Sequence, residues 1–310
     1  FRSNENFFDE ITINTLDEFN EYIKENFSLT LKENDIEPPS ELELVYIRNQ
    51  DSTSFFRGHS KESYELKSTL EREIDKYGVG NISPEEYLHI QKNYLEKCKT
   101  LLRGKFSEQS LLLNKEFDDE IWAIGQHFGL KTPLLDWSYS FWIALFFAFR
   151  EQNTDTKNIN KEECLCNQIH NKVCYNLFKN QISNKDKEEI TYRVVYHLHT
   201  FMNFDVQIIE PKIDFGGRIN AQKGVFTKYL CSELLEINKK HNTHREKNSH
   251  IKIQGLLTKI RINSSLRPKI LEFLDSININ NSVLFPDITG AIEDCHLALH
   301  NILQLETLPD

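Results

Sequence analysis

Residues 126–138 read QHFGLKTPLLDWS, and after two further residues the chain continues at 141–149 as FWIALFFAF. The second segment is the most apolar of the chain, and its composition is typical of a buried helix. The first segment carries a His, an Asp and a Thr-Pro turn, none of which a buried helix requires. We therefore expect this turn to present polar side chains into a cleft whose floor is the apolar helix.

Two helices are expected before this turn. A Ser-Pro-Glu-Glu start predicts a helix over residues 83–102, because Ser caps the helix, Pro fits its first position and Glu stands three residues after the Ser. A second helix is expected over residues 119–128 and should end at Gly129. That helix would carry Gln126 and His127 in its last turn.

The remaining pattern combines strands and helices in one domain. Strands are expected at 45–47, 54–59, 192–199, 206–210, 224–226 and 250–263, further helices at 14–23, 266–277 and 288–305, and a loop at 64–70. We predict an α+β fold with a mixed or antiparallel sheet core flanked by helices. Residues 1–40 should form a helical N-terminal segment, and residues 41–305 a single domain with a polar insertion at about 151–190.

Composition narrows the class of protein. The 310 residues carry a formal net charge of -10, which argues against non-specific coating of nucleic acid. The longest apolar run, residues 141–149, is well short of the roughly 20 residues of a membrane span, so we expect no membrane partner and a cytoplasmic protein. The six cysteines are sparse and unevenly spaced, and we expect them to be reduced.

The polar insertion contains one group of residue types that bind metals. Its members are Cys164, Cys166, His170 and Cys174. Their spacing is not a standard zinc pattern, so we expect a surface insertion with free thiols rather than a zinc site.

Other polar residues follow predicted strands or turns and can reach the cleft. Arg57 and Gly58 lie near the end of the 54–59 strand, and Arg218 and Gln222 follow a Gly-Gly turn. Three of the candidate residues also have a purely structural interpretation. Arg57 can pair with a nearby carboxylate, and His127 and Asp136 can hold their turn rigid through hydrogen bonds. The chain has neither the glycine spacing of a phosphate-binding P-loop nor that of a dinucleotide-binding Rossmann fold.

Five blocks of sequence together resemble the FRG domain family over roughly residues 40–300. They are Phe56-Arg57-Gly58, residues 126–137, Ala144–Ala148, residues 218–226 and Leu284–Asp287. Two departures are Leu134, where the family usually carries Arg, and the insertion at 151–190. The resemblance implies a bacterial setting, often near mobile elements or antiviral defence genes, but little assigned chemistry.

The order of residues is also similar to that of ADP-ribosyltransferases. These enzymes place an Arg or His at the end of an early strand, a Ser-containing strand before an apolar helix, and a late Glu or Gln. The resemblance implies NAD as the substrate, with Arg57 on its phosphates, Ser138 or Asp136 on its ribose, and Gln222 or Glu210 at the cationic centre. The catalytic candidates are Arg57, His127, Asp136 and Gln222, and the cofactor-binding candidates are Arg57, Gly58, Trp137, Ser138 and Arg218.

Two other functions use the same residues. In the first, His127 and Asp136 act as a general acid–base pair of a phosphodiesterase or nuclease, with arginines on the phosphate. In the second, the protein is a non-catalytic module that senses a nucleotide or a protein. Partners therefore range from an NAD-like small molecule to a protein or nucleic-acid acceptor, and the sequence does not indicate an oligomeric state. A neutral Gln222 in place of a Glu would weaken the stabilisation of a cationic transition state.

Overall fold

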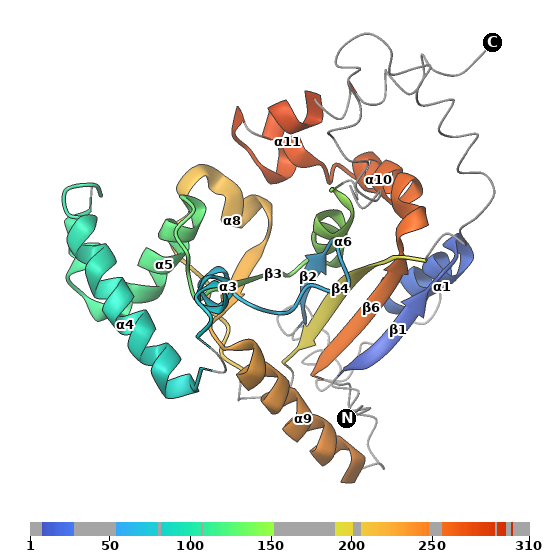
Figure 1. Cartoon of the computed structure of the whole chain (residues 1–310). Coiled ribbons are helices and arrows are strands. Elements are labelled where there is room, and N and C mark those ends of the chain that lie inside the picture. The colour runs from blue at the N-terminus through green and yellow to red at the C-terminus, as the bar shows by residue number, and fades with distance from the viewer. Residues whose placement is uncertain are drawn as a thin grey trace, which may run out of the picture.

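A six-stranded sheet forms the centre of the computed structural model (Figure 1). The structure describes residues 8–27, 54–79, 82–106, 108–151, 190–200, 206–247, 256–288, 290–295 and 299. The strands are β1 (Asp9–Ile13), β2 (Ser54–His59), β3 (Leu135–Ser138), β4 (Tyr192–His199), β5 (Gly224–Thr227) and β6 (Leu257–Asn263), in the spatial order β1-β6-β4-β2-β3-β5. Only β1 pairs in parallel, with β6, while the other pairs in this sheet are antiparallel. The predicted α+β class with a mixed sheet is confirmed.

Alternating apolar residues give the sheet two buried faces. Val195 of β4 packs in a cluster with α1 (Leu16–Phe27), α6 (Phe141–Phe149) and α10 (Arg267–Ser276). Its neighbour Val194 packs in the opposite cluster with α9 (Cys231–Lys247). Because successive side chains of a strand point to opposite faces, β4 is buried on both sides.

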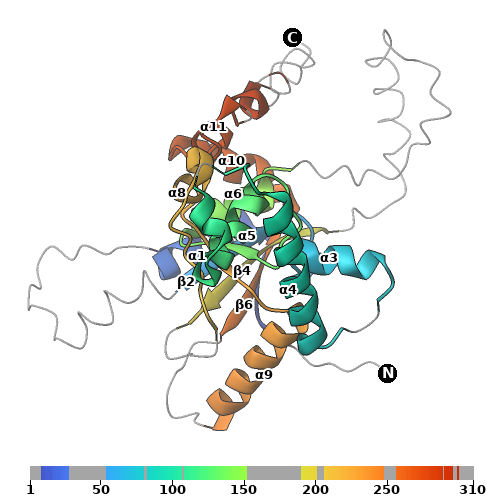
Figure 2. The same ribbon diagram turned by 90° about the vertical axis from the view of Figure 1, so that its left-hand side faces the viewer.

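The other helices are α3 (Thr69–Lys76), α4 (Pro84–Leu101), α5 (Asp118–His127), α8 (Arg218–Ala221) and α11 (Asn281–Leu284). Figures 1 and 2 show α4 and α5 side by side, away from β1. Leu95 of α4 and Trp122 of α5 share a buried cluster with Phe226 of β5, so these two helices cover the β3–β5 end of the sheet. Short 3-10 turns occupy Gln109–Leu112, Lys115–Phe117, Phe215–Gly217 and Ser264–Leu266.

The apolar helix α6 is held at both ends by polar groups. Ser140 caps its start, where the Ser140 hydroxyl accepts a hydrogen bond from the backbone of Ile143. At its end, Arg193 donates to the carbonyls of Ala148 (2.6 Å) and Glu151 (2.8 Å). Arg267 donates to the carbonyls of Phe149 (2.8 Å) and Arg150 (3.0 Å). Carbonyls in the last turn of a helix have no partner within it, and here two guanidinium groups bind those of Ala148 and Phe149 and the two that follow.

Most elements predicted from the sequence are present. The strands at 54–59 and 192–199 have the predicted bounds, and the helices expected at 83–102, 119–128 and 266–277 are α4, α5 and α10. The Ser83 cap also forms as predicted, since Ser83 and Glu86 exchange hydrogen bonds of 2.9 and 3.2 Å. Residues 290–295 are helical, in agreement with the last predicted helix.

β1, α3, α8 and α11 are among the elements that were not predicted. The strand expected at 206–210 is reduced to an isolated bridge at Ile209. In β1, Ile11 and Ile13 alternate with polar residues, but the strand is short, lies at the edge of the described sheet and buries only Ile13. α3 covers residues that were expected to form a loop, and that prediction was wrong from Thr69 onward. The predicted strand at 45–47 and the candidate zinc ligands Cys164, Cys166, His170 and Cys174 lie outside the described residues.

None of the described helices is long and apolar enough to cross a bilayer. No group of three or more His, Cys, Asp or Glu in this part of the chain is arranged to hold a metal ion. Cys98, Cys231 and Cys295 are free thiols.

Candidate functional site

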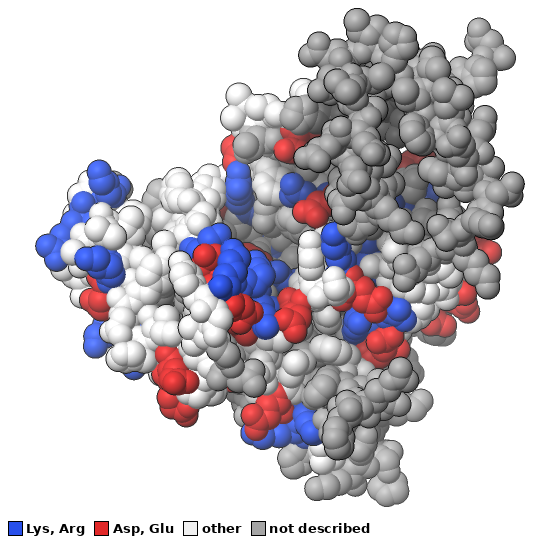
Figure 3. Space-filling model, in the orientation of Figure 1, with Lys and Arg blue, Asp and Glu red and all other residues white. Residues whose placement is uncertain are grey.

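A cavity of about 1040 Å³ lies where β2 and β3 separate. In the described sheet these strands pair at one register position, Phe56 with Ser138, and the residues around that pair line the cavity. Figure 3 shows Lys and Arg side chains gathered beside a hollow in this face of the molecule. The structure brings all eight predicted site residues to this cavity: Arg57, Gly58, His127, Asp136, Trp137, Ser138, Arg218 and Gln222.

Gly58 brings β2 into contact with α6. A Cβ atom at this position would lie 1.9 Å from the carbonyl oxygen of Ala144 and 2.6 Å from the amide nitrogen of Ala148. Both contacts are with helix backbone, which cannot move aside easily, so only glycine fits. The apolar helix was expected to form the floor of the cleft, and Ala144, Phe147 and Arg150 of α6 and its end do line the cavity.

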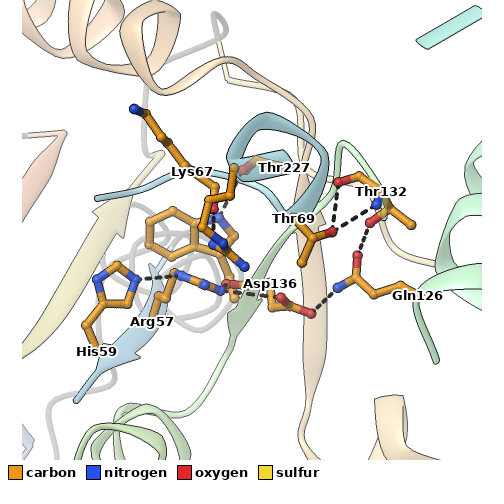
Figure 4. Close-up of polar contacts among 10 residues, drawn as sticks. Arg57, His59, Lys67, Thr69, Gln126, Thr132, Asp136 and Thr227 are labelled. Atoms are coloured by element: carbon orange, nitrogen blue, oxygen red, sulfur yellow. Dashed lines mark hydrogen bonds and ion pairs between the residues drawn. The ribbon is translucent and has the colours of Figure 1, made fainter. Parts of the chain in front are cut away.

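A chain of hydrogen bonds fixes Asp136 (Figure 4). The Thr69 hydroxyl accepts from the backbone nitrogen of Thr132 at 2.9 Å and donates to its carbonyl at 3.2 Å. The Thr132 hydroxyl donates to the side-chain oxygen of Gln126, whose amide nitrogen then donates to Asp136 Oδ1. Because the Gln126 oxygen is the acceptor of this pair, its amide orientation is set and Asp136 receives a donor.

Arg57 occupies the other side of Asp136. Its Nη1 donates to the Asp136 carbonyl at 2.8 Å and lies 3.4 Å from Asp136 Oδ2. Its Nε donates to His59 Nε2 at 2.9 Å. Burial lowers the pKa of Arg57 and the charge of Asp136 opposes that effect. Arg57 does pair with a carboxylate, as the structural alternative proposed, and it also lines the cavity.

The contacts of His59 determine its tautomer. Because Nε2 accepts from Arg57, the ring proton lies on Nδ1, which is 3.2 Å from the Tyr64 carbonyl and donates to it. Burial and the neighbouring charge of Arg57 lower the pKa of His59 to about 3. His59 is therefore a neutral imidazole that supports Arg57, a role the sequence analysis did not assign.

Part of the chain that forms this cavity matches a known sequence family. Residues 52–157 match the model of the FRG domain. This segment is similar to the FRG domain family. The match includes Arg57, Gln126, His127 and Asp136, while Arg218 and Gln222 come from the chain beyond it. Comparisons with curated proteins and with solved structures gave no match.

The segment around α8, which lies beyond the match, completes the cavity. Gly216 and Gly217 both have positive φ, at 77° and 73°, and a Cβ at Gly216 would lie 3.2 Å from the His127 ring. These glycines turn the chain against His127 and direct Arg218 toward Asp287, with its Nε and Nη2 at 3.0 and 2.6 Å from one Asp287 oxygen.

Gln222 and Ser138 bind backbone groups at the cavity wall. Gln222 Nε2 donates to the Leu284 carbonyl at 3.0 Å, which ties α8 to α11. The Ser138 hydroxyl donates to the Gln222 carbonyl at 2.8 Å and accepts from the Ser140 backbone at 3.0 Å. The polar atoms of these two residues thus join chain segments of the cavity to one another.

Trp137 borders the cavity with a side chain that is otherwise buried, and Glu210 lies outside the cavity. Trp137 is only 3% exposed, packs in the cluster with α9, and donates from its indole to Thr227 at 3.0 Å. Glu210 accepts from the Tyr139 hydroxyl and lines a second, smaller pocket. Of the two residues named for the cationic centre, Gln222 therefore lies in the main cavity and Glu210 does not line it.

The cavity has a basic lining. Six Lys or Arg and four Asp or Glu residues are among the described residues that line it, although the whole chain is acidic: Arg57, Lys67, Arg72, Lys76, Arg150 and Arg218 against Glu65, Asp75, Asp136 and Glu151. Lys67 was not predicted as a site residue because a loop was expected at 64–70, and Arg72 was not because α3 was not predicted. Ser68 and Glu71 have the spacing of a helix start and could have indicated α3, and Ser68 does cap it.

Proposed function

We propose that the cavity binds NAD and that the protein breaks the bond between nicotinamide and ribose, as an ADP-ribosyltransferase-like or NAD-cleaving enzyme. The observation that carries this proposal is the convergence of eight separately predicted residues on one cavity with an excess of basic side chains. At about 1040 Å³ the cavity is at the upper end of the roughly 300–1,000 Å³ of small-molecule sites, which suits a dinucleotide.

Arg57 is the phosphate ligand in this proposal. Its Nε and Nη1 are used by His59 and Asp136, and its Nη2 forms no hydrogen bond with the described residues. The guanidinium is therefore held in one orientation with an edge left for phosphate oxygens. A planar, permanently charged group of this kind binds phosphate through paired hydrogen bonds.

Asp136 is the group that stabilises positive charge. When the ribose–nicotinamide bond breaks, the electron pair leaves with the nicotinamide nitrogen and the ribose C1′ becomes cationic. Water or an acceptor nucleophile then bonds to C1′ and releases a proton. The Asp136 carboxylate offers a negative charge to this centre, whereas Gln222 is neutral and its amide nitrogen binds Leu284. Such an activity would suit an effector that depletes NAD in a bacterial toxin or antiviral defence system.

The alternatives use the same cavity differently. A general acid–base pair needs His127 and Asp136 within reach of one reacting group, and no hydrogen bond joins these two side chains within the described structure. A sensor module would bind the nucleotide without turnover. We therefore take cleavage of NAD as the function to test first.

The test is nicotinamide release from NAD by the purified chain, with and without protein and nucleic-acid acceptors. Arg57→Gln and Asp136→Asn should each lower the rate by about 100-fold, the effect of removing one charge-stabilising group. Arg103→Gln is the matched control, because Arg103 is exposed and does not line the cavity. Binding of NAD by the wild type without any release would show a sensor module instead.

A further inference from the structure

Two of the six basic residues in the cavity form no ion pair with a carboxylate in the described part of the chain. The other four form ion pairs with carboxylates: Arg57 with Asp136, Lys67 with Glu65 and Asp75, Lys76 with Glu73, and Arg218 with Asp287. Within the described residues, Arg72 and Arg150 form no ion pair. A positive charge that lines a cavity without a carboxylate partner is available for an anionic ligand.

Arg72 lies on α3, close to the Arg57 side of the cavity. Its Nη1 donates to the carbonyl of Lys67 at 2.5 Å, which holds the guanidinium over the loop before α3. The pKa of His59 is lowered mainly by burial and by the charge of Arg57, and further by the charge of Arg72. Both arginines are therefore close enough to His59 to affect its charge. Together they can hold two adjacent phosphate groups.

Arg150 lies at the end of α6, on a different side of the cavity. Its guanidinium carbon is 4.8 Å from the centre of the Phe285 ring, and Arg218 is 5.2 Å from the same ring. Phe285 directly follows α11, and Figures 1 and 2 both show α11 well apart from α3. Arg218 is neutralised by Asp287, so Arg150 is the unpaired cation at this second position.

We infer that the cavity selects a dinucleotide with two separate phosphate-bearing groups, the diphosphate at Arg57 and Arg72 and a ribose monophosphate at Arg150. This is the chemistry of NADP rather than of NAD. The inference rests on the proposed function and specifies its substrate. The NAD diphosphate alone would leave the Arg150 charge unused.

The test is a titration of the wild type with NAD and NADP by calorimetry at one ionic strength. NADP should bind at least about tenfold more tightly than NAD, as one additional charge-assisted contact predicts. Arg150→Gln should remove this preference by weakening NADP, and Arg150→Lys should retain part of it. Arg72→Gln should weaken both ligands, and Arg103→Gln neither. Unliganded melting temperatures will identify variants that are merely unfolded.

The outcomes separate the inference from the proposed function. Equal affinities of the wild type for NAD and NADP would overturn the second phosphate site. An Arg150→Gln variant whose affinities for NAD and NADP fall by the same factor would overturn it too. Both results leave the proposed function, which needs only that the wild type binds NAD, in place. No binding of either dinucleotide by the folded wild type would remove the proposed function, and the inference would fall with it.

Discussion

At the scale of single residues, Glu71 predicts how stability responds to pH. Its carboxylate is 6% exposed and accepts from the backbone of Cys231 at 3.1 and 3.3 Å, and burial raises its pKa to about 7. Between its ordinary pKa and 7 the folded chain binds more protons than the unfolded chain, so stability falls as pH rises through this range. Glu71→Gln keeps an acceptor for the Cys231 backbone. It should remove the decrease in the free energy of unfolding that Glu71 causes with rising pH, which amounts to up to about 3 kcal/mol.

Denaturant unfolding at pH 5, 6, 7 and 8 measures this effect. Glu73→Gln on the same helix is the control, because Glu73 pairs with Lys76 at the surface and should not flatten the profile. If the wild type and Glu71→Gln lose stability in parallel, Glu71 does not titrate in this range.

Gly58 predicts a steric limit at the cavity. An alanine Cβ would lie within 3 Å of helix backbone at Ala144 and Ala148, so β2 and α6 would have to separate. Gly58→Ala should lower the free energy of unfolding by about 3 kcal/mol, the upper end of overpacking costs. Gly224→Ala is the control, because its Cβ would meet no atom closer than 3.6 Å. Similar losses in both variants would show that contact with α6 is not the cause.

At the scale of elements, α6 depends on two arginines from distant parts of the chain. Arg193 is 1% exposed on β4, and burial, followed by the charge of Arg267, lowers its pKa to about 10. The charge is retained next to another cation because the end of α6 offers carbonyl oxygens and a favourable dipole. Arg193→Met would leave the carbonyls of Ala148 and Glu151 without their donor.

We expect Arg193→Met to lower the free energy of unfolding by about 3 kcal/mol, since a buried carbonyl left unpaired costs about 1–3 kcal/mol. Arg103→Met, at an exposed position, should change it little. Denaturant titration of both variants makes the comparison. Equal stability of Arg193→Met and the wild type would mean that water or Arg267 replaces the lost donors.

At the scale of the whole molecule, local signals predicted local structure well. The Ser83 cap, the apolar run of α6 and the alternation of β4 each identify an element within a few residues. Gathering Arg57, Asp136 and Gln222 in one cavity was also expected. The partner of each side chain was not expected. The Ser138 hydroxyl binds the Gln222 carbonyl, which is far away in sequence. The His59 ring accepts from Arg57 because burial keeps it neutral. Arg72 and Arg150 were missed because neither arginine contributes to the apolar periodicity of its helix.

The segment that matches the FRG domain contains only part of the described sheet. Residues 52–157 supply β2 and β3, two of the six described strands, and these pair with each other at one register position. β2 pairs with β4 at six positions, and β3 with β5 at four, all supplied by the chain beyond the match. Buried residues of β1 and α1, such as Ile13 and Phe19, pack in the same cluster as α6.

A fragment of residues 52–157 would therefore expose both edges of its strands and the apolar surface of α6, a pattern that favours aggregation. We expect it to lack a cooperative thermal transition and to bind a hydrophobic dye, while the full chain melts cooperatively. Circular dichroism of the two proteins, purified under the same conditions, provides the measurement. A soluble fragment with a sharp transition would show that α6 and the β2–β3 pair are stable without the rest of the sheet, and the cavity would then have to be assigned to the matched segment alone.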